Sequence, residues 1–177
     1  MSQDVIETLG NLGDFIGGIG VVATVIYLAV QVGHSTASTK AASYQAVVSA
    51  ISDWSRTIGA DPSIARIFRV GVENSEELTD DEYTQFEMLV VSGTRNFENI
   101  HYQYLAGGIS EAAWEGWSNR ILTFFNQPGL RPWWEHHKAA YSSDFREFVD
   151  DGIKGMSAGP SIIGRQASPN KSLEPDA

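Results

Sequence analysis

The chain has 177 residues and a hydrophobic fraction of 42%, which suffices for one folded domain. Its formal net charge of −10 argues against binding to nucleic acids and against a polybasic contact with anionic lipids. The absence of cysteine excludes disulfides, thiolate metal sites and cysteine nucleophiles.

An uncharged apolar segment follows a short N-terminal segment, residues 1–14. No Asp, Glu, Lys or Arg occurs between Asp14 and Lys40, and residues 15–30 read FIGGIGVVATVIYLAV. Extended to Val32, the segment would be about 27 Å long as an α-helix, close to the thickness of the hydrocarbon core of a bilayer. The sequence therefore predicts a transmembrane helix over residues 15–32. A helix buried in a soluble core is the alternative.

Two other interpretations of this segment fit less well. A cleaved signal peptide is disfavoured, because residues 1–14 hold three acidic residues and no Lys or Arg. Residues 18–23 match the glycine spacing of a dinucleotide-binding loop, but no strand precedes them and no acidic residue follows at the required distance.

The flanking charges predict an orientation. Lys40 and Arg56 follow the predicted span and no basic residue precedes it. The positive-inside rule then places the N-terminus outside and the main domain in the cytoplasm. We expect a single-pass protein of the inner (plasma) membrane.

Small residues recur along the span. Gly13, Gly17, Gly20 and Thr24 lie on one side of a helix, and small residues allow two membrane helices to approach closely. This face is a candidate for a homo-oligomer or for contact with a membrane-protein partner.

The rest of the chain has helical periodicity and no convincing alternation of period two. Apolar residues between Ala41 and Ile58 extend the first helix beyond the span, and Asp61-Pro62 is typical of a helix start. After an acidic linker over residues 73–82, Thr79 and Glu82 fit a capping box. The helix that follows carries one continuous apolar seam, formed by Tyr83, Phe86, Val90, Gly93, Phe97, Ile100 and Tyr104.

Three shorter helical segments complete the predicted domain. Ser110 can cap the first, Pro132 opens the second, and the third follows a break at Ser142-Ser143. From residue 155 onward the apolar period is lost, which predicts a disordered tail over residues 155–177. The expected fold is all-α: a transmembrane helix that continues into a small helical bundle over residues 33–154.

Three stretches are familiar together: GGIGVVATVIYLAVQV, ENIHYQYLAGGISEAAWEGW and QPGLRPWWEHHKAAYSSDFREFVDD. With them the chain resembles, over about residues 10–153, a group of short uncharacterised bacterial proteins with one N-terminal transmembrane helix and a helical domain. The resemblance implies the layout and a membrane location, and no catalytic residue. Relatives often carry Arg or Lys where this chain has Gly33 and His34, which weakens the argument for the orientation.

Few residues are candidates for chemistry. Glu98 and His101 form a Glu-x-x-His pair of the kind found in di-iron bundles, but such sites need two of these motifs and the chain has one. A structural polar pair is therefore the favoured interpretation. In Trp133-Trp134-Glu135-His136-His137 we expect one Trp in the core and the other at a groove or membrane interface, with the His pair as a proton-sensitive patch or a solvated surface.

No serine-nucleophile elbow and no phosphate-binding loop occur, and no cofactor is implied. We therefore expect a non-enzymatic, membrane-anchored interaction or sensory module. One alternative is a helical metal-binding protein or enzyme that uses Glu98 and His101, with His136 or His137 as a further candidate. Another is a receptor with an aromatic pocket for a small ligand.

Overall fold

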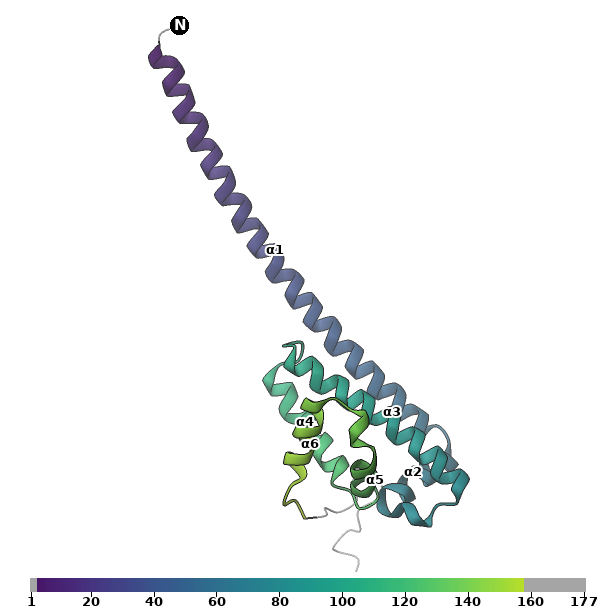
Figure 1. Cartoon of the computed structure of the whole chain (residues 1–177). Coiled ribbons are helices and arrows are strands. Elements are labelled where there is room, and N and C mark those ends of the chain that lie inside the picture. Colours follow the sequence, from purple (N-terminus) through teal and green to yellow (C-terminus); the bar gives the residue numbers. More distant parts are fainter. Residues whose placement is uncertain (1–2, 158–177) are drawn as a thin grey trace, which may run out of the picture. The chain divides into compact units, whose positions relative to one another are not determined.

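A computed structural model describes the backbone of residues 3–157 and the side chains of residues 17–18, 20–31, 33 and 38–157. Within this part of the chain the fold is all-α, as predicted, and contains no strand. The elements in order are α1 (Gln3–Gly59), α2 (Pro62–Asn74), the 3-10 helix η1 (Ser75–Glu77), α3 (Asp80–Leu105), α4 (Glu111–Phe125), α5 (Leu130–His137), the 3-10 helix η2 (Lys138–Ala140) and α6 (Ser143–Ile153) (Figure 1).

The chain divides into two compact units, Met1–Ala42 and Ser43–Ala177. The second unit contains a helical bundle, a term used below for residues 43–157. The bundle begins at Ser43, whereas the sequence analysis placed the start of the helical domain at residue 33. Most of the predicted tail, residues 158–177, lies outside the described residues.

Among the described residues, no helix offers a stretch that is both long and apolar enough to cross a membrane. The predicted span over residues 15–32 includes four apolar positions whose side chains lie outside the described residues: Phe15, Ile16, Ile19 and Val32.

The predicted helix starts are confirmed at three places. The Asp61 carboxylate accepts a hydrogen bond from the Ser63 N–H and caps α2, with Pro62 as its first residue. Thr79 and Glu82 form a capping box at the start of α3, and the Ser110 hydroxyl caps α4. Each cap satisfies backbone N–H groups that have no partner within the helix, so the boundaries follow from local chemistry.

The seam of α3 lies at the centre of the bundle. Five of the seven predicted seam residues are buried, and the terminal two, Tyr83 and Tyr104, are half-buried at its ends. Rings from α2 and α4 meet this seam: Phe68 lies 6.2 Å from Phe86 between ring centroids, and Phe124 lies 5.1 Å from Phe97. The buried cluster unites residues of all six α-helices, so α3 is the spine that the sequence period predicted.

Glycines allow three pairs of helices to approach closely. A Cβ atom added to Gly93 of α3 would lie 2.5 Å from Cζ2 of Trp54, a residue of α1. The Trp54 Nε1–H also donates a hydrogen bond of 2.9 Å to the carbonyl of Leu89, so the indole is held over this glycine. Added Cβ atoms on Gly71 and Gly152 would collide with Phe86 and Leu122, respectively. A side chain at any of these positions would separate the packed helices.

Two details of the C-terminal helices differ from the predictions. Helix α5 begins at Leu130 rather than at Pro132. Trp133 and Trp134 are both in the core, with 3% and 0% of their surface exposed, so the prediction that one of them lies at a groove or interface is wrong. The physical reason is that neighbouring side chains cover both rings: Trp133 stacks on His137, and Trp134 contacts Phe125 and Phe145.

The contact between Trp54 and Gly93 supports a stability prediction. Gly93→Ala should destabilise the bundle by about 1–3 kcal/mol, because the added methyl group displaces the indole. Gly116→Ala is the matched control: Gly116 lies in α4 with open space around it, so Ala should stabilise by about 0.5–1 kcal/mol. Thermal unfolding of the full-length chain in detergent, followed by the near-ultraviolet circular dichroism of tryptophan, measures both. Equal melting temperatures for the two variants would contradict the packing described.

Candidate functional site

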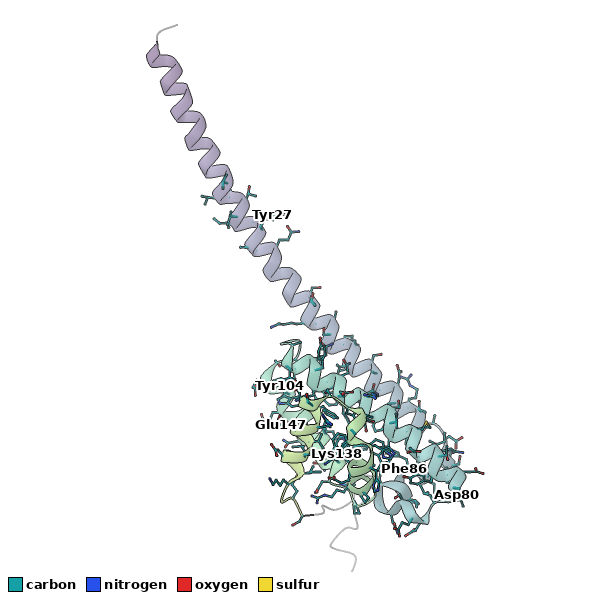
Figure 2. The ribbon with its side chains drawn as sticks, viewed as in Figure 1. Tyr27, Asp80, Phe86, Tyr104, Lys138 and Glu147 are labelled. Carbon is teal, nitrogen blue, oxygen red and sulfur yellow. The ribbon has the colours of Figure 1, made fainter. Side chains whose placement is uncertain are left out.

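The first candidate site is the apolar stretch of α1. Among the described side chains of this stretch, the large apolar ones are exposed, with between 52% and 66% of their surface accessible: Val21, Val22, Val25, Ile26, Tyr27, Leu28 and Val30. Figure 2 marks Tyr27 within this stretch. At 100° per residue these positions point in every direction around the helix, so the stretch has no polar side. A helix that is apolar on all sides requires an apolar environment on all sides.

The small-residue face lies on the same stretch. Gly17 and Gly20 have open space where a Cβ would stand, and the Thr24 hydroxyl donates a hydrogen bond of 2.8 Å to the Gly20 carbonyl. The Thr24 side chain is thereby satisfied within its own helix, as a polar group in an apolar environment must be. For Gly13, the surroundings lie outside what the structure describes.

Glu98 connects two elements of the bundle. Its Oε1 accepts a hydrogen bond of 2.7 Å from the backbone N–H of Ser142, the N-cap residue of α6, and its Oε2 accepts one of 2.7 Å from Arg95. Arg95 also donates to the Ala140 carbonyl and lies over the Tyr141 ring. Burial raises the pKa of Glu98, but these hydrogen bonds outweigh it and lower the pKa below its ordinary value. Oε1 thus holds α3 to the connection between α5 and α6, while Oε2 fixes Arg95, which contacts the same connection.

His101, the second residue of the Glu-x-x-His pair, lies in an aromatic cluster. Its ring stacks on Phe148 with 5.0 Å between centroids and lies 5.4 Å from Trp114 and 5.8 Å from Phe145. Burial lowers the pKa of His101, and the charges of Asp144 and Glu98 only partly oppose this. Among the described residues, no three His, Cys, Asp or Glu side chains are grouped so that they could hold a metal ion. These contacts favour a structural role for the pair.

The two adjacent histidines make different contacts. The His136 Nδ1 faces the Pro132 carbonyl at 2.7 Å and its side chain is exposed. The His137 Nδ1 faces the Trp133 carbonyl at 2.8 Å, and its Nε2 lies 2.9 Å from Oε1 of Glu87 on α3. His137 therefore ties α5 to α3, while His136 lies at the surface. The two rings thus have different contacts, and their role as a proton-sensitive patch stays a prediction.

A cleft of about 620 Å³ lies between α5 and α6 and is lined mainly by charged side chains. Arg131 donates hydrogen bonds to Asn126 and to the carbonyls of Ile153 and Met156. Lys138 pairs with Glu135 and Asp150 at 2.9 and 3.0 Å. These two cations are therefore engaged in holding the ends of α5 and α6 together. The small-ligand hypothesis expected a pocket lined by aromatic side chains. No aromatic side chain lines this cleft.

No family model matches the chain, and no curated protein or solved structure matches it either. The resemblance to short bacterial membrane proteins stays a prediction from the sequence.

The burial of His101 supports a prediction of how the stability of the fold depends on pH. Because burial lowers its pKa below 6.5 in the folded state, the unfolded chain takes up this proton at a higher pH than the folded chain does. The free energy of unfolding should therefore fall as the pH drops below 6.5. His101→Phe removes the titrating group and keeps an aromatic ring beside Phe148. Its melting temperature should fall less than that of the wild type between about pH 7.5 and about pH 5.5. Equal pH dependence in the two proteins would contradict the assignment.

Proposed function

We propose that the protein is a single-pass membrane protein in which residues 15–32 of α1 cross the bilayer and the helical bundle acts as an interaction or sensory module. The single observation that carries this proposal is the stretch from Val21 to Val30, which is apolar on every side of the helix and exposed throughout. Lipid is the environment that surrounds a helix with apolar material in all directions.

The charge pattern supports the same assignment. No acidic or basic residue occurs between Asp14 and Lys40, and a charged side chain at the centre of a membrane helix costs about 2.5–3.5 kcal/mol. Since Lys40 and Arg56 follow the segment and no basic residue precedes it, we place the bundle in the cytoplasm and the N-terminus outside.

The bundle itself supports an interaction role rather than catalysis. Its polar candidate residues are engaged in structural contacts: Glu98 accepts a hydrogen bond from the Ser142 N–H, His101 stacks on Phe148, and Lys138 joins α5 to α6. In this proposal the module presents an ordered helical surface to partners, and none of its residues has a catalytic role.

Charges placed within the span test the anchor. Val22→Asp together with Ile26→Asp should weaken insertion by roughly 5–7 kcal/mol and move the protein from the carbonate-resistant membrane fraction to the soluble fraction. A chain that begins at Lys40 should also be soluble. The matched control is Met88→Asp with Met156→Asp, which adds the same charge at exposed apolar positions of the bundle and should stay in the membrane.

Recovery of the wild-type chain in the soluble fraction would contradict the anchor. In that case the apolar stretch is covered by protein, and a soluble bundle that binds a partner through α1 becomes the better assignment.

We further propose that the span associates through Gly13, Gly17, Gly20 and Thr24, with a second copy as the partner. Gly17→Leu with Gly20→Leu should reduce self-association in a membrane two-hybrid assay severalfold, because the bulkier side chains keep the helices apart. Gly18→Leu is the matched control, since Gly18 lies about 100° away from Gly17 on the same helix. Unchanged association in the double variant would rule out this face.

A further inference from the structure

One end of the bundle differs from the rest of its surface. This end, called the tip below, consists of the last two turns of α3 and the connection to α4, residues 99–110. The tip contains no Asp, Glu, Lys or Arg. It nevertheless exposes two large apolar side chains one turn apart on α3: Tyr102, with 65% of its surface accessible, and Leu105, with 56%. Glu98 and Glu111 flank the tip, but no charged residue lies within it. A group of exposed apolar side chains is typical of a contact surface.

The tip is the end at which α1 enters the bundle. A Cβ atom added to Gly108 would lie 3.6 Å from the Ser43 Cβ, and Ser43 is the first residue of the second unit. Tyr44, the next residue of α1, is also exposed. Three of the large apolar side chains that the bundle exposes thus belong to this end.

The connection to the proposed span is short. Ten residues lie between Val32 and Ser43, and the eleven steps correspond to about 16 Å as an α-helix and at most about 40 Å for a fully extended chain. If residues 15–32 cross the bilayer, this connection keeps Ser43 within about 40 Å of the end of the span.

A run of acidic residues lies at the opposite end of α3. Figure 2 shows Asp80 and Tyr104 at the two ends of this helix, which are about 38 Å apart at 1.5 Å per residue. Six acidic residues lie between Glu73 and Glu82 at the Asp80 end. An anionic membrane surface repels that end and tolerates the uncharged tip. Near the tip, the Glu111 carboxylate accepts a hydrogen bond from the Tyr104 hydroxyl at 2.9 Å.

We propose that the tip lies in the interfacial layer of the bilayer, with Tyr102 and Leu105 as its contacts to lipid. Tyrosine is suited to this layer because its ring is apolar and its hydroxyl can reach water or lipid headgroups. The bundle is then held on the membrane at two points, by the span and by the tip. The proposal rests on the proposed membrane span and adds the lipid surface as a partner of the bundle itself.

Fluorescent labels in the full-length chain test this contact. Because the chain has no cysteine, a single cysteine can be labelled selectively with the polarity-sensitive fluorophore NBD. We choose Leu105→Cys at the tip and Met88→Cys as the matched control. Both positions are 56% exposed on α3, and they are about 25 Å apart along the helix. Leu28→Cys reports on the span, and Tyr102→Cys is a second tip position.

The labelled proteins are reconstituted in vesicles of phosphatidylcholine and phosphatidylglycerol with brominated acyl chains. The label at Leu105 should be quenched by the brominated lipid at least about twofold more than the label at Met88, and its emission should be shifted to the blue. Tyr102→Cys should give the same result.

The other outcomes separate the two proposals. If Leu28→Cys is quenched and both tip labels behave like Met88, the span stands and the tip contact is wrong. If the tip labels are shielded from aqueous iodide but are not quenched by brominated lipid, protein covers the tip and the lipid contact is wrong. If Leu28→Cys is not quenched, the span itself fails, and the tip contact fails with it.

Discussion

The bundle depends on the contact between Trp54 and Gly93. The indole of α1 occupies the space that a side chain on α3 would need, and its N–H is satisfied by the Leu89 carbonyl. The same ring meets Phe68, Phe97 and Phe124, which belong to α2, α3 and α4. One side chain therefore joins four helices. The helix that contributes Trp54 to the core, α1, also contains the apolar stretch.

A second set of contacts holds the C-terminal helices on α3. Glu87, Arg95 and Glu98 lie along this helix and bind, respectively, His137 of α5, the Ala140 carbonyl of η2 and the Ser142 N–H at the start of α6. Charge-assisted hydrogen bonds of this kind are directional, so they set the position of α5 and α6 more sharply than apolar packing alone. The residues that looked most like chemistry in the sequence thus serve the architecture.

The positions of the acidic residues on the bundle agree with the proposed location at a membrane. Acidic residues gather at the Asp80 end of α3, and the tip at the other end carries no formal charge. An arrangement with the tip at the bilayer and the acidic end away from it leaves the acidic groups in water and removes apolar side chains from water. The proposed span and the proposed tip contact are two consequences of the same requirement to cover apolar surface.

The sequence alone determined the features that depend on neighbours along the chain. The caps at Asp61, Thr79 and Ser110, the seam of α3 and the apolar stretch of α1 follow from local hydrogen bonding and from helical periodicity. The tertiary structure decided the rest, because it depends on which helices enclose a residue. Helix periodicity leaves one side of α5 open to water, yet contacts with Phe125, Tyr141, Phe145 and His137 bury both Trp133 and Trp134. Likewise, spacing made Glu98 and His101 a candidate pair. Only the packing of α6 shows that Glu98 accepts a hydrogen bond from the Ser142 N–H and that His101 stacks on Phe148.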